Sequence, residues 1–240
     1  MNLKLALSLT SVSLAAVAFS ATANAEGTNW YAGIQGGVVW LQASSDTTNG
    51  GAAFGGGGTV HNEDFDTGTS VGVFLGHRYS DNWSLALSYD HVSADVSYDV
   101  SYVFAAPSRF EGTADSDLVL LNAIYSTPWG DAGTRWGFTA SAGLGVAFNS
   151  LNDVTEDFTV FNGVADRFLA DGDETQFAAR GTLGATYALD ECWALHAEGS
   201  VFTLGTFSTG SSRTAPLDLI TPYEIDAWGY GLSAGVVARF

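Results

Sequence analysis

The sequence predicts an all-β fold, namely a closed, eight-stranded, antiparallel up-and-down β-barrel that spans a membrane. Three observations predict it. Apolar and small polar residues alternate with period two along many segments, aromatic residues bracket several of these segments, and long polar stretches alternate with short turns. After the N-terminal region, no segment reaches the roughly eighteen consecutive apolar residues that a membrane helix needs. The sequence therefore excludes a helical membrane protein.

The N-terminal segment has the layout of a secretory signal peptide. Lys4 precedes an apolar run from Leu5 to about Phe19, and the small residues Ala23 and Ala25 stand before Glu26. The run is too short to span a bilayer, and it lacks the amphipathic pattern of a helix in a cytosolic domain. We expect residues 1–25 to be the signal peptide and residues 26–240 to be the exported β-barrel domain.

The charge and cysteine content exclude other classes of protein. Lys4 is the only lysine, so residues 26–240 carry seven arginines against 26 acidic side chains. A chain this acidic is not expected to bind nucleic acid. The single cysteine, Cys192, cannot form a disulfide within the chain, so the fold is not a disulfide scaffold, and we expect no special role for this residue.

Aromatic residues lie at both ends of four predicted strands, ten or twelve residues apart. The pairs are Trp30 and Trp40, Trp136 and Phe148, Phe177 and Tyr187, and Trp228 and Phe240. An even spacing puts both rings of a pair on one face of a strand, and the opposite face is small and polar. Ten tilted residues rise about 24 Å, which is the height of the apolar band of a membrane barrel.

We therefore expect two aromatic girdles, one at each edge of this band. Their predicted members are Trp30, Trp40, Trp136, Phe148, Phe177, Tyr187, Trp193 and Trp228. A soluble, exported β-sandwich is the alternative fold. A sandwich, however, has no reason to hold rings at a constant separation along its strands.

The connections give the number of strands. The predicted strands cover residues 29–43, 67–79, 83–100, 115–126, 135–149, 174–189, 192–206 and 224–240. Tight turns are expected at 80–83, 127–134 and 189–193, and long loops at 44–65, 101–114, 149–173 and 208–222. Both termini then lie at the end with short turns. Short periplasmic turns and long extracellular loops are typical of bacterial outer-membrane barrels.

Two predicted strands fit the alternation less well. The segment Leu118 to Tyr125 is apolar on both faces, so its inward face cannot be assigned. From Val92 onward, the third strand moves its apolar residues from odd to even positions. A β-bulge near His91 or a strand that rises above the membrane would each explain this change.

Three segments resemble the small outer-membrane β-barrel superfamily, which includes the transmembrane domain of outer membrane protein A and the Opa-like "porin family" barrels. They are TNWYAGIQGG, GHRYSDNWSLALSYDH and the alternating C-terminal strand that ends in Arg-Phe. The resemblance implies localisation to the outer membrane after cleavage of the signal peptide. It also implies contact with outer-membrane lipid and lipopolysaccharide, and recognition by the barrel assembly machinery. The implied assembly signal consists of Tyr230, Leu232, Val236 and Phe240.

An eight-stranded barrel is just wide enough to be filled by its own side chains, so an open diffusion pore is not expected. The polar residues predicted to face inward are Arg78, Asp90, Arg180, His196 and Glu198. We expect Arg180 to pair with Glu198 on the adjacent strand, because buried charges are costly unless they are paired.

Two groups of residues are candidates for an enzymatic site. Catalysis by a Ser-His-acid arrangement could use His91 with Ser93 and Asp95, or His196 with Glu198 and Ser200, since each set alternates on one face. The second set also fits an ordinary inward-facing stripe of polar side chains. With four histidines and many serines, such spacings arise by chance. We expect the protein not to be an enzyme.

No cofactor or metal site is expected. GGAAFGGGG follows no buried parallel strand and opens no helix, so it is interpreted as loop and not as a phosphate site. The acidic segments at 62–66 and 171–175 lack the spacing of a calcium loop and are interpreted as solvated loop tips. The sequence thus predicts a structural barrel that displays acidic loops at the cell surface, with a narrow channel for small solutes or ions as the alternative. It does not identify a ligand of the loops.

Overall fold

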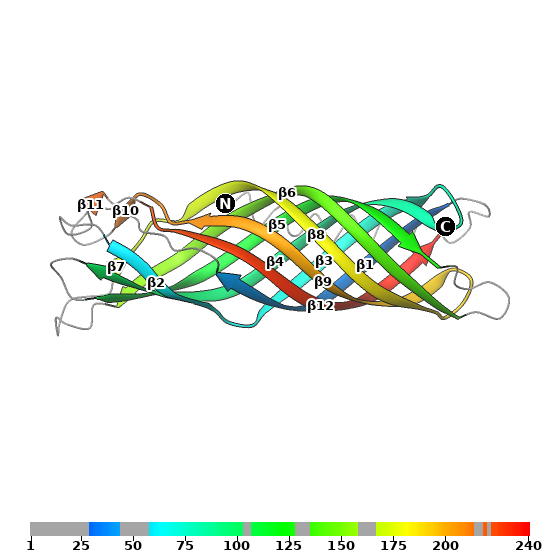
Figure 1. Ribbon diagram of the computed structural model, residues 1–240, viewed down its shortest axis with the longest axis horizontal. Coiled ribbons are helices and arrows are strands. Elements are labelled where there is room, and N and C mark those ends of the chain that lie inside the picture. Colours follow the sequence, from blue (N-terminus) through cyan, green and yellow to red (C-terminus); the bar gives the residue numbers. More distant parts are fainter. Residues whose placement is uncertain are drawn as a thin grey trace, which may run out of the picture.

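The computed structural model of the chain describes residues 29–43, 58–102, 107–127, 135–157, 167–213, 218–219 and 222–240. Within these residues, eight strands form one closed antiparallel ring (Figure 1). In ring order they are β1 (Trp30–Ala43), β3 (Gly68–Arg78), β4 (Trp83–Tyr102), β5 (Ser108–Ser126), β6 (Trp136–Asp157), β8 (Gly172–Ala188), β9 (Trp193–Ser208) and β12 (Glu224–Arg239). Pairing of β12 with β1 closes the ring. The predicted fold class is confirmed.

No helix in the described residues is long and apolar enough to cross a membrane. The predicted signal peptide, with Ala23, Ala25 and Glu26 at its cleavage site, lies outside the described residues.

The register of the strands sets their tilt. A row of paired residues that starts at Trp30 on β1 passes through all eight strands and returns to β1 at Trp40. This stagger of ten residues per circuit tilts the strands by about 35–45° to the barrel axis, because stagger and tilt are linked in a closed sheet. The barrel is therefore a narrow, strongly sheared cylinder.

Two short turns connect neighbouring strands at one end of the barrel. At the first, the Tyr79 and Ser80 amides donate to the Trp83 carbonyl over 3.1 Å and 3.3 Å. At the second, the Asp190 carboxylate accepts the amides of Cys192 and Trp193 over 2.8 Å and 2.7 Å. A carboxylate that accepts neighbouring amides stabilises a tight turn locally. Residues 128–134 of the third predicted turn lie outside the described residues.

Strand β4 rises above the membrane without a bulge. Its pairing with β3 runs in continuous register from Arg78 and Ser84 to Thr69 and Ser93. Its pairing with β5 is also continuous past His91. Even-numbered residues therefore face inward along the whole strand. At Val92 the apolar residues change from the outward to the inward face because the medium outside the barrel changes from lipid to water. Of the two explanations for the shifted alternation, the rising strand is correct and the β-bulge is wrong.

Much of the chain predicted as long loops forms strand. Strands β5 and β6 extend to Ser108 and Asp157, and β2 (Gly58–Phe65) pairs with the upper part of β4. The short strand β7 (Arg167–Phe168) pairs with β6, and β10 (Ser212–Arg213) pairs with β11 (Asp218–Leu219). The loop boundaries predicted from polarity were wrong because polar residues on these extensions face water on one side of a strand.

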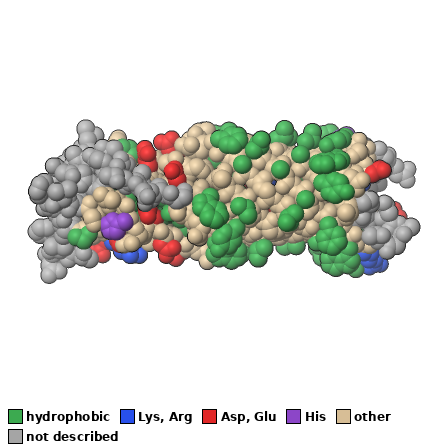
Figure 2. Space-filling view, in the orientation of Figure 1, with side chains coloured by type: hydrophobic (Ala, Val, Ile, Leu, Met, Phe, Trp, Pro, Cys, Tyr) green, Lys and Arg blue, Asp and Glu red, His purple; other side chains and the backbone are tan. Residues whose placement is uncertain are grey.

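The barrel has two halves with opposite polarity. We call the part between the two aromatic girdles the membrane half. The part beyond the girdle of Trp40 and Phe148, which the sequence predicts to face the outside of the cell, we call the extracellular half. Figure 2 shows hydrophobic side chains spread over the membrane half, whereas Asp and Glu side chains gather over the extracellular half, toward the left of the view. Inside, the polarity is reversed, because the apolar core lies in the extracellular half.

Glycines on neighbouring strands make room for the large side chains inside the membrane half. A Cβ atom added to Gly76 would collide with the ring of Tyr31, and one added to Gly72 would collide with the carboxylate of Asp90. In a lumen this narrow, each large inward side chain lies opposite a glycine, which has no side chain to occupy the same space.

Candidate functional site

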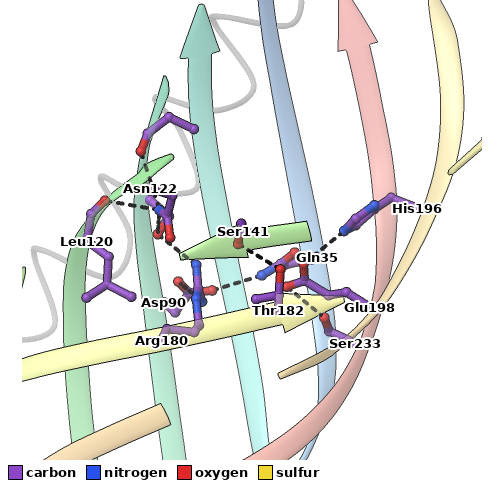
Figure 3. Close-up of polar contacts among 12 residues, drawn as sticks. Gln35, Asp90, Leu120, Asn122, Ser141, Arg180, Thr182, His196, Glu198 and Ser233 are labelled. Atoms are coloured by element: carbon purple, nitrogen blue, oxygen red, sulfur yellow. Dashed lines mark hydrogen bonds and ion pairs between the residues drawn. The ribbon is translucent and has the colours of Figure 1, made fainter. Parts of the chain in front are cut away.

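The interior of the membrane half contains a network of polar side chains centred on Asp90 and Arg180 (Figure 3). The Arg180 guanidinium on β8 donates from Nη1 to Asp90 Oδ2 on β4 over 2.7 Å, and from Nη2 to Ser88 Oγ over 3.0 Å. Gln35 on β1 donates from Nε2 to Asp90 Oδ1 over 3.0 Å. Three strands that are distant in sequence are thus tied together across the lumen.

A second part of the network lies on β5 and β4. The Asn122 amide donates from Nδ2 to Ser88 Oγ over 3.0 Å, so Ser88 connects it to Arg180. Asn122 fits because Gly143, on the adjacent strand, has no side chain against its Oδ1. The serine hydroxyl accepts from both neighbours, which orients the guanidinium as well as the amide.

Glu198 has a different partner from the predicted one. His196 Nε2 lies 3.2 Å from Glu198 Oε2, and Ser233 Oγ donates to Glu198 Oε1 over 3.5 Å. The predicted pairing of Arg180 with Glu198 is wrong, since Arg180 binds Asp90. The prediction failed because neighbouring strands were considered alone, whereas a guanidinium in so narrow a lumen also reaches across it.

The Asp90–Arg180 ion pair is largely buried. The exposed fractions of the two side chains are 11% for Arg180 and 7% for Asp90. Removing charges from water is costly, and this cost is repaid only where the geometry is good and further hydrogen bonds satisfy the groups. Gln35 and Ser88 supply those bonds. The pair therefore acts as a polar plug that fixes several strands at one level.

Two small cavities flank this plug. One, of about 90 Å³, extends toward the end with short turns and is lined by Tyr31, Arg78 and Ser126, among others. The other, of about 30 Å³, lies toward the extracellular half under Val39, Val92 and Phe202. Both are lined by Gln35, Arg180 and Glu198, so these three side chains stand between them. The larger cavity has room for several water molecules.

The extracellular half closes the lumen with an apolar core. The rings of Tyr98 and Phe110 stack at 5.0 Å between centroids, and Tyr223 packs against Phe110 at 5.4 Å. All three side chains are buried. Burial raises the pKa of the Tyr98 phenol well above its usual value, so the ring stays neutral.

A buried ion pair lies within this extracellular core. Arg213 on β10 donates from Nη1 to Glu156 Oε2 on β6 over 3.1 Å, and the exposed fractions of the two side chains are 1% and 0%. Sequence reasoning missed this pair because both residues fall in segments predicted as long loops. The segment NSLNDVTED gives only a weak signal, because the register shift around Asp153 moves the inward positions from Leu151 to Val154 and interrupts the alternation of β6.

The residues predicted to face inward lie as follows. Arg78, His196 and Glu198 line the larger cavity, while Asp90 and Arg180 form the ion pair. Gln35, Ser88 and Asn122 also belong to the network. Asn122 was not among the predicted residues because its segment is apolar on both faces, and its inward direction was therefore unassigned.

The predicted aromatic residues lie on the outer surface in two groups. Trp30, Trp136, Tyr187 and Trp193 lie at the end with short turns, where the rings of Trp136 and Tyr187 approach to 4.9 Å. Trp40, Phe148, Phe177 and Trp228 lie near the other edge of the apolar band, where Trp40 stacks on Tyr230 at 5.5 Å. Trp83 and Tyr125, at 5.3 Å from each other, also lie near the short turns and were not among the predicted members.

The two groups weighed for catalysis are arranged differently from a Ser-His-acid triad. His91 Nδ1 lies 2.8 Å from Asp117 on β5, and not against Asp95 as the weighed set required. His196 binds Glu198, and the hydroxyl within reach of its ring is Thr186 Oγ1, at 3.5 Å, rather than Ser200. Neither set provides the nucleophile–base hydrogen bond that a triad needs.

Within the part of the chain that the structure describes, no group of three or more His, Cys, Asp or Glu residues could hold a metal ion. The acidic segment 62–66 lies on and after β2, and 171–175 lies at the start of β8. Cys192 is exposed in its turn. These residues provide no additional chemistry to the interior of the barrel.

A family model described as an outer membrane protein beta-barrel domain matches residues 9–240. No curated protein matches the chain. Among solved structures, OprG from Pseudomonas aeruginosa is 17% identical over 89% of this chain and 98% of its own, with a TM-score of 0.51. Neisserial surface protein A is 17% identical over 89% and 98%, with a TM-score of 0.44. The outer membrane protease OmpT from Escherichia coli is 8% identical over 89% and 94%, with a TM-score of 0.48.

The likeness to OprG supports the barrel fold. The family model covers every strand of the ring, and with it the polar network and the apolar core described above. The protein is located in the outer membrane of a Gram-negative bacterium. The chain belongs to the outer membrane protein beta-barrel domain family.

Proposed function

We propose that the protein is a closed barrel that serves as a structural, surface-display scaffold, and that it is neither an enzyme nor an open pore. The observation that carries this proposal is the apolar core of the extracellular half. Tyr98, Phe110 and Tyr223 are packed together where a pore would need an aqueous exit. A path for solutes through this core would need to expose buried apolar side chains to water.

The shape of the extracellular half also supports a display role. Strands β4, β5 and β6 continue well beyond the membrane half, so the ends of these strands lie away from the lipid surface. The exposed outward residues of these strands and of β2 are largely acidic. They include Asp64, Asp66, Asp95, Glu111, Asp153 and Asp157, with Arg109 as a basic neighbour. The displayed surface is thus rigid at its base and negatively charged.

A narrow conduit for small solutes or ions is the second candidate function. The observation that favours it is the pair of cavities on either side of Arg180, each lined in part by polar side chains. If the extracellular core opened, the ion pair of Asp90 and Arg180 would be the remaining barrier in the lumen. The two candidates make opposite predictions about conductance.

Reconstitution of residues 26–240 in planar lipid bilayers tests the closed barrel. Folding is verified first by the heat-dependent shift of the barrel on a denaturing gel. We expect no discrete conductance steps from the folded protein. Reproducible steps that change size in Asp90→Asn would overturn the scaffold and establish the conduit, because that substitution alters the lumen alone.

Labelling of cysteines on intact cells tests the orientation that display requires. In a Cys192→Ser background, Ser101→Cys places a thiol on the extracellular part of β4. We expect a membrane-impermeant maleimide to label it on intact cells. The natural Cys192, which is exposed at the opposite end, serves as the matched control and should react only after the outer membrane is permeabilised. The reverse result would contradict surface display.

We also propose the processing and partners that the sequence implies. The signal peptide would direct export and be cleaved between Ala25 and Glu26. The assembly machinery would recognise the outward and terminal positions Tyr230, Leu232, Val236 and Phe240 of the last strand, and the two aromatic groups would lie at the lipid and lipopolysaccharide interfaces. Mass spectrometry of the purified barrel tests the first point, since a mature N-terminus other than Glu26 would contradict it.

A further inference from the structure

The larger of the two cavities is the part of the membrane half where buried polar atoms lack partners. Asn122 Oδ1, Thr139 Oγ1 and Arg180 Nε are buried and have no hydrogen-bond partner among the described residues. All three residues line this one cavity, which has a volume of about 90 Å³. Buried polar atoms in proteins are almost always hydrogen-bonded, and an exception points to a water molecule, an ion or strain. The cavity is therefore lined by groups that can bind a small polar guest.

The charges on the wall of this cavity select the kind of guest. Besides one tyrosine, its ionisable side chains are Arg78, Arg180, His196 and Glu198. Asp90, which is the counter-charge of Arg180, lines the smaller cavity and not this one. Two guanidinium groups thus line the larger cavity together with a single carboxylate.

That carboxylate, on Glu198, already has partners. His196 Nε2 lies 3.2 Å from Glu198 Oε2, and Ser233 Oγ donates to Glu198 Oε1 over 3.5 Å (Figure 3). The His196 and Glu198 side chains are each only 10% exposed, so their contact is shielded from bulk water. Glu198 forms its ion pair with His196, and not with either of the two arginines.

Arg78 has no counter-charge within the described part of the chain. It stands at the end of β3, next to a short turn, and its side chain is partly buried. Its guanidinium forms no hydrogen bond or ion pair with any described residue. A charge that is removed from bulk water is costly unless an opposite charge pairs with it, and a neutral water molecule leaves it unbalanced. The cavity wall thus has an excess of positive charge, which attracts anions and repels cations.

We propose that the larger cavity binds a small inorganic anion such as a halide. Arg78 pairs with the anion and Thr139 donates its hydroxyl to it, while Arg180 adds positive potential from the side of the plug. Water molecules fill the rest of the cavity. The anion enters from the end with short turns, since the apolar core closes the lumen at the other end. The site is separate from the acidic outer surface on which the display role depends.

Chloride-35 NMR of folded residues 26–240 in a nonionic detergent tests this proposal, because chloride that exchanges with a protein site gives a broadened signal. Detergent micelles without protein provide the baseline. We expect excess broadening that saturates as the chloride concentration rises and that added bromide removes by competition. Absence of excess broadening would overturn the proposal, and so would broadening that does not saturate.

Three variants locate the bound anion. Arg78→Gln removes the charge, so half-saturation should require about tenfold more chloride, which is the size of one charge-assisted hydrogen bond. Arg78→Lys keeps the charge and should bind chloride more tightly than Arg78→Gln. Arg109→Gln is the matched control, because it makes the same substitution at an exposed arginine of the extracellular half, and it should leave half-saturation unchanged. The gel shift on heating verifies that all three variants fold.

Three further outcomes would each overturn the site. Unchanged half-saturation in Arg78→Gln would place the anion elsewhere on the barrel. An equal loss in Arg109→Gln would show that the net charge of the chain, and not the cavity, attracts chloride. An equal loss in Arg78→Lys would show that Arg78 supports the wall of the cavity and does not pair with the anion. None of these results depends on conductance, so the anion site can fail while the closed barrel stands.

Discussion

The membrane half and the extracellular half use the same strands in opposite ways. On β4, the inward residues of the membrane half include Ser88 and Asp90, while those of the extracellular half include Val96 and Val100. The outward residues change at the same level, from Leu87 to acidic and hydroxyl side chains. The backbone register does not change between them. The difference between the halves therefore lies in the solvent outside the barrel.

The comparison shows how the outer solvent determines what holds the inside. Around the extracellular half there is water, so burying Tyr98, Phe110 and Leu151 provides the hydrophobic driving force of an ordinary protein core. Around the membrane half there is lipid, so moving apolar side chains to the interior gains little. That interior is held instead by hydrogen bonds and the ion pair of Asp90 and Arg180.

Among the described residues, each half has a buried ion pair between an arginine and a carboxylate. The Glu156–Arg213 pair is almost fully buried, and Glu156 Oε1 has no hydrogen-bond partner among the described residues. The Asp90–Arg180 pair has partners on both carboxylate oxygens and a cavity on each side. Water can replace a lost partner in the second case but not in the first. The same substitution should thus cost more in the extracellular half.

The largest expected effect follows from Glu156→Gln. The substitution removes the negative charge that faces the buried Arg213 guanidinium, and breaking a buried ion pair typically costs about 3–5 kcal/mol. We expect the free energy of unfolding in detergent, measured by urea titration, to fall by this amount. Glu111→Gln is the control, because Glu111 is exposed and should change the stability by less than about 0.5 kcal/mol. Equal losses in both variants would contradict the dry core.

A second test places the same charged side chain on the outer surface of each half, at two positions of β4. Leu87→Arg puts a charge on the lipid-facing wall, which costs about 2–4 kcal/mol near the middle of the bilayer. Asp95→Arg puts the same side chain on the same face of β4 in the extracellular half, where it meets water and acidic neighbours. We expect the first variant to fold poorly into lipid vesicles and the second to fold normally. Similar folding yields would move the membrane boundary away from the girdle.

The outer surface of the membrane half could be predicted from the sequence. Apart from the segment Leu118 to Tyr125, its strands alternate, because lipid on one side and a polar lumen on the other impose a period of two. The ten residues between Trp30 and Trp40 equal the stagger of the barrel. A row of paired residues that starts at Trp30 returns to β1 at Trp40 after one circuit of the sheet. Period and spacing are local properties, and a sequence displays local properties directly.

The extracellular half was predicted poorly for the same physical reason. Its polar side chains face outward, so the segments that hold Arg109, Glu111 and Asp153 looked like loops although they are strands. The partner of Arg180 was also missed, because its contact with Asp90 joins residues on opposite sides of a closed ring. Contacts across a lumen depend on the register of every strand between them, which no local pattern contains.

The third test concerns the lumen itself. Asp90→Asn removes the charge that faces Arg180 but keeps an oxygen that can accept a hydrogen bond. We expect a loss of about 1–3 kcal/mol, which is smaller than for Glu156→Gln because water in the flanking cavities can solvate the guanidinium. Urea titration of the two variants side by side measures the difference. A larger loss for Asp90→Asn than for Glu156→Gln would contradict the inference that water reaches the Asp90–Arg180 pair and not the Glu156–Arg213 pair.

The smallest expected effect comes from adding one methyl group to β8, either on its inward face or on its outward face. A Cβ atom at the inward Gly184 would lie 2.8 Å from both the Ala197 carbonyl oxygen and Thr139 Oγ1, whereas one at the outward Gly181 would meet nothing within 4 Å. Gly184→Ala should therefore cost about 1 kcal/mol, at the low end of overpacking. Gly181→Ala should leave the stability within about 0.5 kcal/mol or raise it slightly, since alanine lowers the entropy of the unfolded chain. Urea titration resolves a difference of this size, and equal stabilities would mean that the lumen at this level is not tightly filled.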